Sequence, residues 1–169
     1  SMLPLRGGKG RQWEGGIREP FYFRFPELIK ANSTCGVPVS GIDFYPTFLE
    51  LTGIPIPQEQ VIDGRSIVSL LSGEQDREIA ERDLFWHYPH YGTQGGDPSS
   101  IIKNGPWKMI HYYEDSHDEL YNLDSDPGER NDVIADNRTK ATELRQRLDS
   151  WLAEVSAKFP VPDPQYDPE

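Results

Sequence analysis

Residues 101–112 read IIKNGPWKMIHY, and this segment carries the clearest structural signal in the chain. Two largely apolar runs flank Asn104-Gly105, and Asn-Gly is the strongest short signal for a hairpin turn because both residues tolerate positive φ. Pro106 stands at the start of the second run, where a missing N–H is tolerated. The sequence therefore predicts an antiparallel hairpin with strands at 101–103 and 107–113.

The segments on either side extend this hairpin into a sheet. Residues 84–88 and 119–123 are short runs rich in apolar and aromatic residues, bounded by turn formers, which is typical of strands. Residues 139–158 instead carry an apolar stripe at helical spacing, made of Leu144, Leu148, Trp151, Leu152 and Val155. We therefore predict an α+β fold in which a four-stranded antiparallel sheet packs against a C-terminal helix.

The first half of the chain predicts two further elements. The aromatic run at residues 21–25 suits a buried strand of a larger sheet. Residues 43–52 suit a helix that ends at Gly53, with Ser40 or, better, Asp43 as its N-cap. Phe44, Phe48 and Leu51 would face a core.

Composition excludes several classes of partner. The 169 residues carry 28 acidic and 17 basic side chains, for a net charge of -11. Nucleic acids and anionic membrane surfaces need basic patches, so neither is expected as a partner. No apolar run approaches the ~20 residues of a membrane-spanning helix. One cysteine, Cys35, cannot form an internal disulfide.

A glycine-rich segment near the N-terminus, GGKGRQWEGGIREP at residues 7–20, is the first candidate for chemistry. Glycines let a backbone approach a ligand closely, and Lys9 between them can bring a point charge to an oxyanion. The plainer interpretation is a mobile loop with a solvated lysine. Gly10 follows Lys9, so the segment is not a phosphate-binding P-loop. Glu14 and Arg18 could form an ion pair that holds the loop, or serve the substrate.

Three segments, in this order, resemble the sulfatase family: residues 8–20, residues 43–53 (DFYPTFLELTG) and residues 119–131 (ELYNLDSDPGERN). The resemblance implies part of an α/β enzyme of the alkaline phosphatase superfamily. It also implies that Lys9, which matches a family lysine, binds the sulfate group and stabilises the negative charge that develops during transfer.

The same resemblance identifies what the chain lacks. Sulfatases convert the first residue of a Cys/Ser-x-Pro-x-Arg motif to formylglycine, but Cys35 is followed by GVPV. The family's metal ligands precede the matched segments, so we expect no metal site or cofactor in this chain, and formylglycine with Ca²⁺ or Mg²⁺ in the parent enzyme. The predicted domains are a remnant of the catalytic α/β domain at 1–72, a C-terminal subdomain at 73–159 and an extended tail at 160–169.

Residues 86–91, WHYPHY, resemble a stretch at the mouth of the pocket in glycan-degrading sulfatases. The resemblance implies that His87 or His90 faces the leaving group or a sugar, where a histidine could donate a proton. Tyr91 could stack on a sugar ring. The alternatives are a packing histidine at a strand end and a merely exposed tyrosine. Pro89 prevents the helix that a metal-binding histidine pair would need.

These observations predict the C-terminal part of a sulfatase that hydrolyses a sulfate ester on a glycan, and that is inert alone. The alternative is a non-catalytic module that binds sulfated glycans or another partner. A related phosphodiesterase would share the fold. For the parent, a periplasmic or secreted location is expected, and for this chain self-association through exposed apolar surface.

Overall fold

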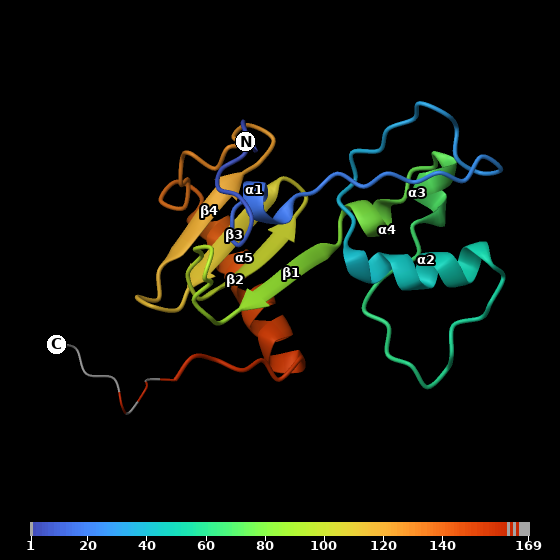
Figure 1. The fold of residues 1–169 in the computed structure, drawn as a ribbon. Helices are drawn as coiled ribbons and strands as arrows, with labels where there is room; N and C mark the ends of the chain where they lie inside the picture. Colours follow the sequence, from blue (N-terminus) through green and yellow to red (C-terminus); the bar gives the residue numbers. More distant parts are fainter. Residues whose placement is uncertain (1, 162, 164, 166–169) are drawn as a thin grey trace. The chain divides into compact units, whose positions relative to one another are not determined.

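The computed structural model describes residues 2–161, 163 and 165, which pack into two units (Figure 1). One unit contains the residues up to Glu19 and those from Asp83 onward, and the other is Pro20–Arg82. The expected boundary lay at residues 72 and 73, whereas the N-terminal glycine-rich segment packs with the sheet. The elements in order are α1 (Glu14–Ile17), a 3-10 turn (Gly41–Asp43), α2 (Phe44–Leu51), α3 (Val68–Ser72), α4 (Arg77–Ala80), β1 (Asp83–Tyr88), β2 (Ser99–Asn104), β3 (Trp107–Tyr112), β4 (Asp118–Asn122) and α5 (Arg138–Glu154).

The four strands form one antiparallel sheet in the order β1-β2-β3-β4, as the sequence predicts. Its centre is the β2–β3 hairpin, in which Ile101 pairs with Ile110. The turn between them places Gly105 at φ 52°, in the left-handed region that the Asn-Gly signal requires. In Figure 1 the strands lie in sequence order across the sheet.

The two faces of the sheet carry different partners because side chains alternate along each strand. On one face Ile102, Met109 and Leu120 pack against buried residues of α5. On the other face Ile101, Ile110, Tyr112, Tyr121 and Leu123 pack against Trp13 and Ile17, which flank and end α1. The segment that contains Lys9 is thus joined to the face opposite α5. Helix α5 ends at Glu154, earlier than predicted, and Val155 is 49% exposed.

The Pro20–Arg82 unit is organised by Asp43. Its carboxylate caps the 3-10 turn together with Ser40, accepts the N–H of Arg65 at 2.9 Å and pairs with Arg82. Burial raises the pKa of Asp43, but the bonds from Arg82, Arg65 and Ser40 outweigh it and hold the pKa below its usual value. Asp43 therefore does not cap α2 as predicted, since its side chain accepts no bond from the first turn of that helix. It belongs instead to a reciprocal arrangement with Ser40 that joins three segments.

Two expectations for this unit are wrong. Residues 21–25 form no strand, because no described segment pairs with them, and the Phe21 ring packs on Phe44 instead, with centroids 4.9 Å apart. Helix α2 does not bury its apolar stripe: Phe48 is 54% exposed, whereas Pro46 and Thr47 are buried. The core of the unit consists of Ile67, Leu70 and Ile79.

In the part of the chain that the structure describes, every helix is too short or too polar to cross a membrane.

We predict that the isolated chain self-associates through the Pro20–Arg82 unit. Its large exposed apolar side chains include Tyr22, Ile42, Phe48, Ile54 and Val61, and burying apolar surface drives association. In sedimentation equilibrium, the average mass should rise with concentration, and Phe48→Glu should weaken this rise. Gln58→Glu, which adds the same charge at an exposed polar position of the same unit, is the control. A monomer at all concentrations would contradict the prediction.

Candidate functional site

The Lys9 loop, defined here as Arg6–Gln12, is held by the two glycines of α1. Gly15 donates its N–H to the carbonyl of Arg6 at 2.8 Å. A Cβ at Gly15 would lie 2.4 Å from that carbonyl oxygen, and a Cβ at Gly16 would lie 2.1 Å from the carbonyl oxygen of Arg11. Both distances are far below van der Waals contact, so only glycine lets α1 lie directly against the loop.

A buried ion cluster fixes α1 to the sheet. The ammonium of Lys108, on β3, lies 3.1 Å from the Glu14 carboxylate and 2.8 Å from the Glu129 carboxylate. Glu129 also accepts the backbone N–H of Glu14 at 2.6 Å. All three side chains are at least 97% buried. The partner of Glu14 is therefore Lys108, whereas Arg18, the partner expected from the sequence, is exposed.

The cluster holds two carboxylates and one ammonium away from water. Burial raises the pKa of the Glu129 carboxyl above its ordinary value, and the pull of Lys108 and of the Glu14 N–H only partly offsets this effect. Removing one member of a buried ion pair leaves an uncompensated charge and typically costs ~3–5 kcal/mol. The three segments that meet here are thus strongly constrained to stay together.

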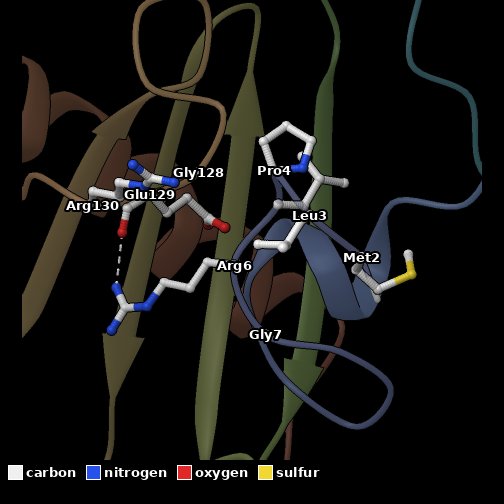
Figure 2. A pocket seen from close by; sticks show the side chains of 9 residues that line it. Met2, Leu3, Pro4, Arg6, Gly7, Gly128, Glu129 and Arg130 are labelled. Atoms are coloured by element: carbon white, nitrogen blue, oxygen red, sulfur yellow. Dashed lines mark hydrogen bonds between the residues drawn. The ribbon is translucent and has the colours of Figure 1, made fainter.

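Arg6 adds a second anchor between the loop and the chain after β4. Its guanidinium donates to the Tyr121 hydroxyl and to the Glu129 carbonyl, both at 3.0 Å, and lies 3.9 Å from the Trp13 ring centroid. Figure 2 shows this bond to Glu129 beside an open hollow of about 620 Å³, lined by residues 2–7 and 128–130. Lys9 does not line that hollow. Because the Arg6 guanidinium is bonded to other protein groups, we assign Arg6 an anchoring role.

The Tyr91 loop, defined here as residues 89–98, lies against the Lys9 loop. A Cβ at Gly96 would lie 2.3 Å from the carbonyl oxygen of Gly10, so the two backbones touch. The Gln12 amide donates to Asp97 at 3.4 Å and to the Tyr112 hydroxyl at 3.1 Å. The structure thus brings together two segments that are about 80 residues apart in sequence and that the sequence had singled out separately.

Three of the predicted site residues are exposed on these adjoining loops: Lys9, His90 and Tyr91. Lys9 forms no hydrogen bond or ion pair with any described residue. The His90 ring packs edge-on against Tyr88, with centroids 5.6 Å apart. These loops therefore present a cation, an imidazole and a phenol to solvent from a fixed backbone.

His87 lies elsewhere. It alternates with Trp86 along β1, and its ring packs near Phe159, with centroids 5.7 Å apart, beyond the end of α5. Its Nδ1 lies 2.7 Å from the Ser100 hydroxyl and its Nε2 lies 2.7 Å from the Lys158 carbonyl. Both ring nitrogens are thus occupied on the face that α5 covers, whereas the Lys9 loop joins the other face.

The residues present do not fit the metal or the formylglycine that the family resemblance implies. Within the described ranges no group of three or more His, Cys, Asp or Glu side chains is placed to hold a metal ion. Cys35 is free and exposed, outside the motif that formylglycine formation needs. We derive no chemical step through either group in this chain.

We predict that Gly16→Ala destabilises the chain by about 1–3 kcal/mol, the usual cost of overpacking. In an ordinary helix this change would stabilise by up to ~1 kcal/mol, so the sign tests the contact with the Arg11 carbonyl. Urea unfolding gives the free energy, and hydrogen exchange in residues 6–12 should increase. Gly8→Ala is the control, because a Cβ there meets nothing within 4 Å. Equal stability of the two variants would contradict the close approach.

Comparison with known proteins places this arrangement in a family. The family model described as "N-sulphoglucosamine sulphohydrolase, C-terminal" matches residues 9–158. A sulfatase of Formosa agariphila is 38% identical over 167 residues, which cover 91% of this chain and 30% of that protein. Human steryl-sulfatase is 40% identical over 83 residues, which cover 49% of this chain and 14% of that protein.

The fold agrees with solved structures. A structure described as a complex with the substrate D-glucosamine-2-N,6-O-disulfate matches with a TM-score of 0.67 and 28% identity, covering 85% of this chain and 29% of that one. The present chain thus spans less than a third of the length of each of these relatives. Its matched residues and fold agree, and the chain belongs to the sulfatase family, within which it corresponds to the C-terminal portion.

Proposed function

We propose that this chain forms the C-terminal part of an enzyme that hydrolyses a sulfate ester, and that Lys9 contacts the sulfate group. The observation that carries the proposal is the contrast within the Lys9 loop. The backbone is fixed by Gly15, Gly16 and the buried Glu14 cluster, whereas the Lys9 side chain is exposed and unpaired among the described residues.

This contrast suits electrostatic catalysis. During hydrolysis of a sulfate ester, negative charge develops on the leaving oxygen, and a cation held in place stabilises that charge without reorganising at the moment of reaction. A lysine that is already paired with a carboxylate could not serve in this way. The formylglycine and the Ca²⁺ or Mg²⁺ would come from the remainder of the parent enzyme, and this chain supplies the lysine.

The substrate that we propose is a sulfated glycan. The family includes a steryl-sulfatase as well as a protein crystallised with a disulfated glucosamine, so family membership alone leaves both classes open. The Tyr91 loop favours the sugar, because it places an exposed phenol and an exposed imidazole next to the Lys9 loop. An aromatic ring can stack on a sugar, and a histidine can donate a proton to its oxygens.

In the full-length enzyme, Lys9→Ala should lower kcat/KM about 10²- to 10³-fold, the usual effect of removing one preorganised charge-stabilising group. The measurement is release of sulfate from glucosamine 6-O-sulfate, with a steryl sulfate assayed in parallel. Lys140→Ala is the control, because Lys140 lies on α5 and pairs there with Glu143. Equal activity of the two variants would refute the role of Lys9, and hydrolysis of the steryl sulfate alone would refute the glycan.

The chain by itself should not hydrolyse any sulfate ester, because it carries neither a formylglycine motif nor a described metal site. The purified 169-residue chain and the full-length enzyme would be assayed side by side on the same substrates. Titration of the isolated chain with glucosamine 6-O-sulfate tests the alternative function. Tight binding that Lys9→Ala abolishes would support a stand-alone binding module, and turnover by the isolated chain would contradict the proposal.

A further inference from the structure

We propose that Arg11 forms a second anion-binding position beside Lys9, which receives a second sulfate or carboxylate group of the substrate. This inference rests on the proposed function and extends it from the scissile sulfate to substrate selection. The ligand class it predicts is a sugar that carries two anionic groups, of which only one is hydrolysed.

The first observation is the position of the Arg11 guanidinium. A Cβ at Gly95 would lie 2.1 Å from the Cζ and 2.2 Å from one Nη of Arg11, so the guanidinium lies directly on the Gly95 backbone. Gly95 also has a φ of 92°, which other residues rarely adopt. A side chain at residue 95 would occupy the place of the guanidinium, so only glycine lets Arg11 lie on the Tyr91 loop.

The second observation is the absence of a partner. Arg11 is half-buried, yet its side chain forms no hydrogen bond or ion pair with any described residue. The four other half-buried arginines among the described residues all have partners. Arg6 donates to Tyr121 and to the Glu129 carbonyl, and the other three pair with aspartates: Arg82 with Asp43, Arg145 with Asp118 and Arg147 with Asp83. In a chain with a net charge of -11, an arginine without a carboxylate is a local basic spot.

The third observation is the backbone that carries both cations. Arg11 donates its N–H to the Gly8 carbonyl at 3.0 Å, and its own carbonyl lies against Gly16. The backbone is therefore fixed on both sides of Lys9. Two residues span at most ~7 Å of chain, so Lys9 and Arg11 start from points whose separation suits two anionic groups on one sugar or on adjacent sugars.

The chemistry of the two side chains suits different tasks. Lysine offers a compact charge, whereas arginine offers a planar fork that binds sulfate or carboxylate through two parallel hydrogen bonds. Contact with Gly95 occupies a face of the guanidinium, and no described residue accepts hydrogen bonds from its N–H groups. Arg11 is thus oriented by the protein while its donors are left for a ligand.

The test compares two substrates in the full-length enzyme: glucosamine 6-O-sulfate and glucosamine 2-N,6-O-disulfate. Arg11→Met keeps the apolar stem and removes the charge, and Arg11→Lys keeps the charge and removes the fork. We expect Arg11→Met to lower kcat/KM for the disulfated sugar about 10- to 100-fold more than for the monosulfated one, the value of a charge-assisted hydrogen bond. Arg11→Lys should restore part of this preference.

The readout is the ratio of the two kcat/KM values, because a structural role would lower both together. Lys140→Met is the matched control and should leave the ratio unchanged. If Arg11→Met leaves the ratio unchanged, whether or not both activities fall, the second anion-binding position is overturned while the sulfatase proposal stays intact. A wild-type enzyme that hydrolyses neither sugar would instead overturn the glycan substrate, and the second position with it.

Discussion

The buried ammonium of Lys108 is the constraint on which the rest of this arrangement depends. A charge without exposed surface needs compensation, and Lys108 finds it in Glu14 and Glu129, at 3.1 and 2.8 Å. These carboxylates come from segments that precede and follow the sheet. Since neither segment can leave without exposing or isolating a charge, the cluster ties the N-terminal loop and the turn after β4 to β3. Replacing one member of such a cluster would leave an uncompensated buried charge.

Glycines connect this cluster to the two loops, because they allow the backbones to approach closely. Glu14 fixes the start of α1, and the missing side chains of Gly15 and Gly16 let α1 touch the carbonyls of the Lys9 loop. Gly96 does the same for the Tyr91 loop at the carbonyl of Gly10, and Gly95 leaves room for the Arg11 guanidinium. The result is a backbone that is fixed while the cations on it stay unpaired. A fixed backbone reduces the freedom that a cation loses when it is oriented toward a ligand or a transition state.

The sequence predicted the sheet and α5 because their signals are local. Asn104-Gly105 marks a turn regardless of its surroundings, and the apolar period of 3.6 marks α5. It did not predict Lys108, although alternation along β3 places this residue on the same face as Ile110 and Tyr112, which was the available signal. The strand at residues 21–25 failed for the opposite reason, since a strand exists only with a partner and propensity cannot supply one.

The same alternation separates the candidate site residues. Successive side chains of β1 point to opposite faces, so His87 joins the chain beyond α5, and its neighbours Trp86 and Tyr88 belong to the face that carries the Lys9 loop. The WHYPHY motif therefore contributes side chains to two surfaces at once. Sequence similarity alone does not identify which of its residues belongs to which surface. The face covered by α5 buries one apolar core, and the opposite face, where the two glycine-lined loops meet, is the one that presents unpaired cations in an acidic protein.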